Sequence, residues 1–419
     1  MGHLVGKDIY RELGKKVDSL SMRAPWNKEF HAILKELYSA EEADLVVRLP
    51  YGLSTIEEIE KTTGYPRIEL ERMLESLASR GLVMDLFMFG GYRYMISPLV
   101  VGIFEFTMMR TRGNLDSKTW AELFHTYLMG DDTFFRANFG SDQSVSPMRT
   151  IPHEDAFSES GYVEVLDYEK AAEIVNSSKK FAIGICSCRH EKLHNNEKKC
   201  DVPLDTCLSF GTAADYLVRH EMANEVSKSE MLESLSCSKE MGLVLNADNV
   251  RKRPSFICQC CSCCCNVLLG ISTFGYPNVI VTSNYIVDSD DEVCAQCDEC
   301  IEVCPIGALE RHPLGYTKIN KELCLGCGVC VLKCDTGALS LVKRKQRVLH
   351  PYDTFERVIL QCLERGTLQN QIFKNPQSIT HAFMRGFLGG FLKLSAVKSA
   401  LMSETLRSRF LTAMRKMAH

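Results

Sequence analysis

Two stretches of the sequence space their cysteines in a way that suits metal chemistry. Residues 294–305 read CAQCDECIEVCP, and residues 324–335 read CLGCGVCVLKCD. In both stretches the first three cysteines stand at every third position, and a fourth follows after three more residues. Three thiolates on one tight loop can bind three corners of a [4Fe–4S] cube, whereas the fourth cysteine leaves in another direction. The spacing therefore predicts iron–sulfur sites, with a pair of zinc knuckles as the alternative.

The segment from about residue 285 to 345 resembles the bacterial ferredoxins that bind two [4Fe–4S] clusters. PIGAL (305–309) and DTGAL (335–339) follow the fourth cysteines as the short helix and turn of each half, and TKINKEL precedes the second loop as a strand. Asp335 departs from the family, which usually has proline there. In the family, the fourth cysteine of each run ligates the other cluster. The resemblance implies one ligand set of Cys294, Cys297, Cys300 and Cys334, and a second of Cys324, Cys327, Cys330 and Cys304.

A further group of cysteines lies upstream. The apolar residues before ICSCRH (185–190) predict a strand, and alternation would place Cys186 and Cys188 on one face of it. Arg189 and His190 are candidates for hydrogen bonds to cluster sulfur. The alternatives for these thiols are one or more further iron–sulfur clusters, a zinc site, or a dithiol that is redox-active or simply reduced. The candidate metal ligands are Cys186, Cys188, Cys200, Cys207, Cys258, Cys260, Cys261, Cys263, Cys264 and Cys265.

Two cysteines, Cys237 and Cys362, lie outside these cysteine-rich segments. Cys237 follows Ser227 and Glu230, whose spacing predicts a capping box at the start of a helix. Cys362 lies in another apolar helical pattern, RVILQCLERG. We expect both to be small core residues.

The central block, residues 150 to 345, resembles cytoplasmic iron–sulfur proteins of strict anaerobes. In that group a CxCR segment and a cysteine-dense segment precede a two-cluster ferredoxin domain, as ICSCRH and ICQCCSCCC do here. The resemblance implies electron transfer rather than a defined substrate.

The elements before this block have another pattern. Capping residues predict helices from Ser39 and from Ser54 or Thr55, and Pro66 opens a helix with an apolar stripe of Ile68, Met73, Leu74 and Leu77. Two strands around the Gly90–Gly91 pair then predict a hairpin. Residues 28–98 resemble a winged-helix domain. Because acidic residues outnumber basic ones from Glu41 to Arg80, we expect protein docking or a structural role rather than DNA binding.

The carboxyl-terminal residues from Ser378 are basic and amphipathic, with Glu404 as the single acidic residue. This pattern favours either packing on the chain's own domain or docking to a partner, with a membrane surface as the third possibility.

Composition excludes several classes of protein. The chain has 419 residues, 45% of them hydrophobic, and a net charge of −4, which argues against a generally basic nucleic-acid binder. The first 20 residues lack the apolar core of a secretory signal, and no run of uncharged apolar residues is long enough to span a membrane, so we expect a cytoplasmic protein. No GxGxxG or GxxxxGK[ST] motif predicts a nucleotide site.

These observations predict a multidomain α+β protein. Its expected parts are a helical and winged-helix-like region (1–98), a helical linker (99–150), a central α/β cysteine-rich domain (151–284), a dicluster ferredoxin domain (285–345) and a basic helical tail (346–419). The predicted function is transfer of single electrons between a redox partner and a catalytic oxidoreductase in anaerobic metabolism, the chain itself being a non-catalytic subunit. The alternatives are a redox-responsive DNA-binding regulator, or a reductase with an open cluster site among the central cysteines.

Overall fold

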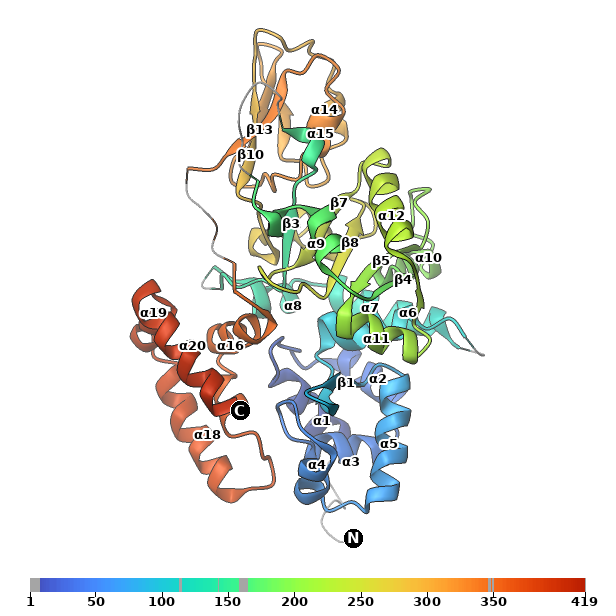
Figure 1. The fold of residues 1–419 in the computed structure, drawn as a ribbon, viewed down its shortest axis with the longest axis vertical. Helices are drawn as coiled ribbons and strands as arrows, with labels where there is room; N and C mark the ends of the chain where they lie inside the picture. The colour runs from blue at the N-terminus through green and yellow to red at the C-terminus, as the bar shows by residue number, and fades with distance from the viewer. Residues whose placement is uncertain are drawn as a thin grey trace. The chain divides into compact units, whose positions relative to one another are not determined.

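The chain folds into two compact units of mixed α/β structure. The computed structural model describes residues 8–112, 115–141, 143–157, 165–345, 348 and 350–418. Unit 1 combines Met1–Val145 with Phe355–His419, and unit 2 is Ser146–Thr354 (Figure 1). The carboxyl-terminal helices thus belong to the same unit as the amino-terminal ones, an association that the sequence did not predict.

Unit 1 is mainly helical, with one hairpin. Its amino-terminal elements are α1 (Ile9–Asp18), α2 (Lys28–Leu37), α3 (Ala40–Arg48), α4 (Ile56–Thr63), α5 (Arg67–Ser79), β1 (Val83–Met88), β2 (Gly91–Ile96), η1 (Leu99–Ile103), α6 (Phe104–Met109), α7 (Ser117–Met129) and α8 (Thr133–Phe139). Its carboxyl-terminal elements are α16 (Thr354–Glu364), α17 (Leu368–Ile372), α18 (Ile379–Leu392), α19 (Ser395–Met402) and α20 (Glu404–Ala418).

Local signals position the amino-terminal helices as predicted. Capping boxes start α3 at Ser39 and α4 at Thr55, and Gly64, with φ of 74°, ends α4 in the left-handed conformation. β1 and β2 pair antiparallel, and their two-residue turn, Phe89 and Gly90, has positive φ at both positions, as a type I′ turn requires. The predicted helices and hairpin are therefore present, while the likeness to a winged helix stays a prediction.

The predicted apolar stripe of α5 is wrong at one residue, Ile68. Met73, Leu74 and Leu77 are buried, but Ile68 is 84% exposed. Ile68 lies in the first turn of α5, beyond the part of the helix that packs on its neighbours, so periodicity alone misassigned it.

The carboxyl-terminal helices form a hydrophobic core in unit 1 together with Val145. Leu360, Cys362 and Leu363 of α16 are buried in it, which confirms the prediction for Cys362. On α18, by contrast, an exposed apolar row stands at intervals of four residues: Ile379, Phe383, Phe387 and Phe391. Among the described residues, no helix has both the length and the apolar character needed to cross a membrane.

Unit 2 is built on a seven-stranded sheet with the order β6-β4-β5-β8-β7-β3-β9, in which only β3 and β9 pair parallel among the described strands. The elements of the sheet region are β3 (Met148–Ile151), η2 (Glu154–Ala156), η3 (Asp167–Glu169), α9 (Ala171–Ser177), β4 (Phe181–Ile185), α10 (Ser187–His194), β5 (Asp205–Phe210), α11 (Gly211–Arg219), β6 (Ala223–Glu225), α12 (Lys228–Glu240), β7 (Val244–Asp248), β8 (Phe256–Cys260), α13 (Asn266–Ser272), η4 (Pro277–Val279) and β9 (Ile280–Val281).

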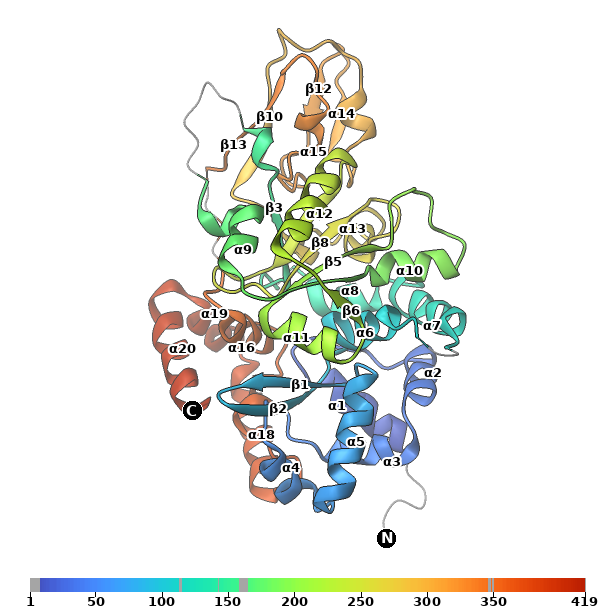
Figure 2. The same cartoon turned by 45° about the vertical axis from the view of Figure 1, so that its right-hand side comes forward.

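The two faces of this sheet differ in chemistry. Successive side chains of a strand point to opposite faces. On β8, Ile257 joins the apolar core and Gln259 donates to Ser234 Oγ of α12 at 2.9 Å, so Cys258 and Cys260 point to the other face. Figure 2 shows α9 and α12 on the apolar side. That core is formed by Ile151, Ala171, Ile174, Val175, Phe181, Leu208, Phe210, Met231, Leu235, Leu245, Ala247 and Ile257.

The remainder of unit 2 consists of two similar halves. Each half has a cysteine loop, a short helix, a turn and a strand. The elements are β10 (Tyr285–Ser289), α14 (Glu299–Glu302), β11 (Leu309–Arg311), β12 (Thr317–Ile319), α15 (Val329–Leu332) and β13 (Leu339–Lys343). β10 pairs antiparallel with β13, and β11 with β12. PIGAL and DTGAL form the turns into β11 and β13, whereas the short helices precede the fourth cysteines rather than follow them.

Two of the sequence predictions for upstream cysteines are wrong. The strand before Cys186 is present, but it ends at Ile185, and Cys188 lies in α10 instead of alternating along the strand. Cys237 lies near the carboxyl end of α12 and is exposed rather than buried. α12 packs on the sheet through Met231 and Leu235, so the side of the helix that carries Cys237 faces away from the core.

A buried carboxylate in unit 1 provides a test of how α16 is held. Glu364 accepts hydrogen bonds from Ser144 N at 2.9 Å, from Ser144 Oγ at 2.7 Å and from Val145 N at 2.9 Å. Glu364→Ala leaves these donors unsatisfied, and we expect it to lower the free energy of unfolding by about 3 kcal/mol. Urea denaturation followed by circular dichroism measures the change.

Glu122→Ala is the matched control, because Glu122 is exposed and its contact with Lys118 is a surface ion pair at 3.9 Å. It should change the stability by less than about 0.5 kcal/mol. Equal effects of the two substitutions would contradict the role assigned to Glu364.

Candidate metal centres

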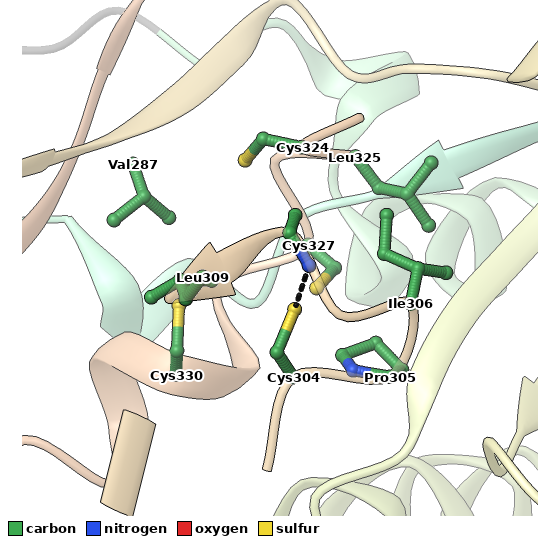
Figure 3. A pocket seen from close by; sticks show the side chains of 10 residues that line it. Val287, Cys304, Pro305, Ile306, Leu309, Cys324, Leu325, Cys327 and Cys330 are labelled. Atoms are coloured by element: carbon green, nitrogen blue, oxygen red, sulfur yellow. Dashed lines mark hydrogen bonds between the residues drawn. The ribbon is translucent and has the colours of Figure 1, made fainter. Parts of the chain in front are cut away.

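The structure brings cysteines of both ferredoxin-like halves to one cavity. Cys324, Cys327 and Cys330 of the second loop line it together with Cys304 from the end of the first run (Figure 3). Ala308 N donates to Cys304 Sγ at 3.1 Å, which orients that sulfur from the turn that follows it. The apolar residues Val287, Ile306, Leu309 and Leu325 complete the lining. A thiol-lined cavity with an apolar wall fits the donor set of a [4Fe–4S] cluster.

The other four ferredoxin cysteines also form one neighbourhood. Cys300 is buried and interacts electrostatically with Cys334, Cys297 and Cys294, which are its partners in the implied ligand set. Burial is the main cause that raises the pKa of the Cys300 thiol. Thr317 Oγ1 of β12 lies 3.2 Å from Cys300 Sγ and is a polar neighbour that the cysteine spacing could not reveal.

The loops of the two halves share backbone conformations but not residues. Gln296 and Asp298 have φ of 59° and 67°, and the equivalent Gly326 and Gly328 have φ of 68° and 86°. A Cβ atom on Gly326 would overlap the carbonyl oxygen of Tyr285. The second loop therefore needs glycine because it packs against β10, whereas the first loop tolerates side chains at these positions.

The second loop is also fastened to the sheet region. His153 N donates to Cys327 O at 2.9 Å, and His153 Nε2 lies 2.8 Å from the carbonyl oxygen of Leu243, the residue just before β7. Burial lowers the pKa of His153, which favours the neutral imidazole. Cys324, Cys327 and Cys330 are buried, while Cys297 of the first loop is exposed. The two cysteine sets of the ferredoxin-like segment thus have different access to solvent.

The upstream cysteines separate into two groups. The first, which we call the sheet-face thiols, gathers on the sheet face opposite α9 and α12. Cys207 of β5 is paired with Cys258 of β8 in the sheet, and hydrogen bonds link the Cys258 thiol to those of Cys207 and Cys260. Cys265, which precedes α13, contacts Cys260 and Cys188. Cys186 completes the group and lies beside Cys188 and Cys207.

A buried amide borders the sheet-face thiols. Asn246 of β7 has no exposed surface, and its Oδ1 accepts from Thr150 Oγ1 at 3.1 Å. Its Nδ2 has no oxygen or nitrogen partner within the described ranges and lies beside the Cys260 thiol. Hydrogen bonds from Cys258 and Cys265, with a further contribution from Asn246, lower the pKa of Cys260 to about 6. The residue type alone could not have identified Asn246, because strand pairing brings it to Cys258 and Cys260.

The second group, the tetrathiol group, is more compact. The Sγ atoms of Cys200, Cys261, Cys263 and Cys264 all lie within 4.8 Å of one another. Cys200 comes from the loop after α10, and the other three from the loop between β8 and α13. The pKa of Cys261 is lowered to about 4, first by a hydrogen bond from Cys264 and also by Arg189.

Arg189 of α10 connects the two groups electrostatically. Its side chain has no exposed surface, and Nη2 donates to Gln259 O at 3.0 Å and to Cys261 Sγ at 3.5 Å. Burial alone would lower its pKa, but the neighbouring Cys186 and Cys261 raise it. Because a buried cation requires an anionic partner, this arginine favours thiolates around it. His190, the other residue singled out in the sequence, lies 2.9 Å from His194 through their Nε2 atoms.

Comparison with known proteins bears on the ferredoxin-like segment alone. Residues 293–339 match the 4Fe-4S dicluster domain family, so this segment is an iron–sulfur, ferredoxin-like domain, as the sequence predicted. No curated protein and no solved structure matches the chain. The match does not extend to the upstream cysteines or to unit 1.

The glycine in the second loop offers a test of the loop packing. Gly326→Ala combines positive φ with an overlap against β10, and we expect it to lower the free energy of unfolding of the ferredoxin-like segment by about 2 kcal/mol or more. Retained iron and the thermal unfolding midpoint of anaerobically purified protein are the measurements.

Gln296→Ala is the control at the equivalent position of the first loop. It keeps a Cβ at the same φ and lies on the surface, so we expect a change within about 0.5 kcal/mol. Tolerance of alanine at position 326 would show that the loop is not packed as described.

Proposed function

We propose that this protein transfers single electrons through two [4Fe–4S] clusters held by its ferredoxin-like domain. The observation that carries the proposal is the arrival of Cys304 in the cavity of the second cysteine loop. This arrangement supports the reciprocal ligation implied by the sequence, since the fourth thiolate of each set comes from the other run. We assign Cys324, Cys327, Cys330 and Cys304 to one cluster, and Cys294, Cys297, Cys300 and Cys334 to the other.

When bound, such clusters accept and release one electron at a time at potentials set by their surroundings. The protein's residues tune and insulate the two sites differently. Buried thiols and the apolar side chains of Val287, Ile306 and Leu309 exclude water from the second-loop set. The first-loop set is nearer to solvent through Cys297.

This difference suggests a direction for electron exchange with partners. Asp291, Glu292 and Glu299 are exposed around the first loop, so a basic surface on a partner protein would be attracted there. The second loop instead contacts the sheet region through His153. We propose that a partner docks at the first loop, and that the partners are a catalytic oxidoreductase subunit and an electron donor or acceptor.

We further propose that the sheet-face thiols hold an additional iron–sulfur cluster. The group contains six thiols, and four of them would suffice to ligate a [4Fe–4S] cluster: Cys186, Cys188, Cys207, Cys258, Cys260 and Cys265. Their contacts run in series across β5, β8 and the starts of α10 and α13, and the six thiols do not form one compact group. Thiolates spread in this way suit a cluster whose irons are bound at separate corners.

The alternative of a DNA-binding regulator has less support. Arg67, at the start of α5, forms ion pairs with Glu57, Glu60 and Glu71 at 3.1, 3.6 and 2.7 Å. A cation surrounded by carboxylates is a poor phosphate ligand. We expect no salt-dependent binding of duplex DNA in fluorescence anisotropy at low ionic strength, and submicromolar binding with a steep salt dependence would favour the regulator.

Pairs of cysteine variants test the electron-transfer proposal. We expect Cys304→Ser to abolish the same electron paramagnetic resonance signal as Cys330→Ser, and Cys334→Ser the same signal as Cys300→Ser, with a loss of about four irons each time. Reductive titration of anaerobic protein follows both signals.

Cys237→Ser is the matched control, because its thiol is exposed on α12. It should retain the iron content and both signals. If Cys304→Ser and Cys300→Ser instead affected one common signal, the reciprocal ligand sets would be wrong.

A further inference from the structure

The spacing of the tetrathiol group matches a single tetrahedral ion. Its Sγ–Sγ distances include 3.7 Å for Cys200–Cys261, 3.9 Å for Cys200–Cys264, 4.0 Å for Cys261–Cys263 and 3.5 Å for Cys263–Cys264. A tetrahedron with Zn–S bonds of about 2.3 Å has an edge of about 3.8 Å. Thiolates on the corners of a [4Fe–4S] cube stand further apart, because each binds a different iron.

The ferredoxin cysteines provide an internal comparison. Among the described residues, only the tetrathiol group has three or more potential ligand atoms that all lie within 4.8 Å of one another. The sulfur atoms of the cysteines at residues 294–334, which lie in the dicluster match, are not grouped this closely. In the described part of the chain the tetrathiol group is thus the one set in which all four sulfur atoms are mutually close, and this spacing is too tight for the corners of a cube.

The residues around the tetrathiol group form a closed site. Val202 and Leu243 pack against the thiols, and Cys261 and Cys264 are buried. The backbone N–H of Val202 donates to Cys200 Sγ, and Arg189 Nη2 donates to Cys261 Sγ. Donors of this kind orient metal-bound thiolates and offset the net negative charge of four thiolates around a divalent ion. With all four positions supplied by the chain, no position is open for a substrate.

We propose that Cys200, Cys261, Cys263 and Cys264 bind one structural Zn²⁺, separate from the iron–sulfur centres. The ion would join the loop after α10 to the loop before α13. These two helices begin next to Cys188 and Cys265, which contact each other among the sheet-face thiols. The zinc ion would thereby fix the positions of the two helix starts that carry Cys188 and Cys265 of the sheet-face thiols. It would not itself change oxidation state.

Metal analysis and zinc K-edge X-ray absorption of the full-length protein, purified without oxygen, test the site. We expect about one zinc per chain with four sulfur neighbours at about 2.3 Å. This zinc should remain after ferricyanide has destroyed the iron–sulfur clusters. Cys263→Ser should reduce zinc to near zero and leave the two ferredoxin signals in place, while Cys237→Ser changes neither.

Other outcomes would overturn the assignment. Absence of zinc together with iron loss in Cys263→Ser would place the tetrathiol group in an iron–sulfur cluster, and a mononuclear iron in the unmodified protein would replace zinc as the occupant. If Cys263→Ser does not fold, the absorption spectrum of the unmodified protein still decides. The test is independent of electron transfer, because zinc content and the ferredoxin signals are measured separately.

Discussion

Alternation of side chains across the seven-stranded sheet is the constraint on which unit 2 depends. On β8, Ile257 and Gln259 must face α12 if Cys258 and Cys260 are to face the opposite side, and a shift of one residue would exchange the two sets. The apolar core under α9 and α12 therefore stabilises the sheet, and it also determines which face of the sheet the thiols occupy. Burial of apolar side chains on one face thus positions the cysteine side chains on the other.

A buried positive charge organises the cysteine face. Arg189 donates to Pro203 O at 2.9 Å, to Thr206 Oγ1 and to Gln259 O, so it links α10, the loop before β5 and β8. It also donates to Cys261 Sγ. Because its side chain is buried, an arginine held this way stabilises thiolate rather than thiol, and it interacts with cysteines of both groups. Its hydrogen bonds thus connect three segments of the fold, and its charge favours the thiolate form of the neighbouring cysteines.

The two halves of the ferredoxin-like domain show how one backbone can serve different surroundings. Both loops place the residues on either side of the middle cysteine in the left-handed conformation. Gly326 and Gly328 allow the second loop to approach β10 and η2 closely, whereas Gln296 and Asp298 remain at the surface of the first. The two loops thereby combine similar backbone conformations with unequal exposure of their cysteines to solvent.

The sequence by itself determined the features that depend on short spacing. The capping boxes at Ser39 and Ser227 and the hairpin that follows α5 each involve residues that are close along the chain, where local hydrogen bonds decide the structure. The ferredoxin-like segment belongs here too, since its repeated cysteine spacing is a property of two tight loops.

Only the tertiary structure decided which upstream cysteines lie together. Cys200 meets Cys261 across 61 residues of chain, Cys207 meets Cys258 through strand pairing, and adjacent residues such as Cys264 and Cys265 belong to different groups. The same holds for exposed Cys237 and for the packing of α16 in unit 1. Such partnerships depend on sheet order and long-range burial, which local spacing does not encode.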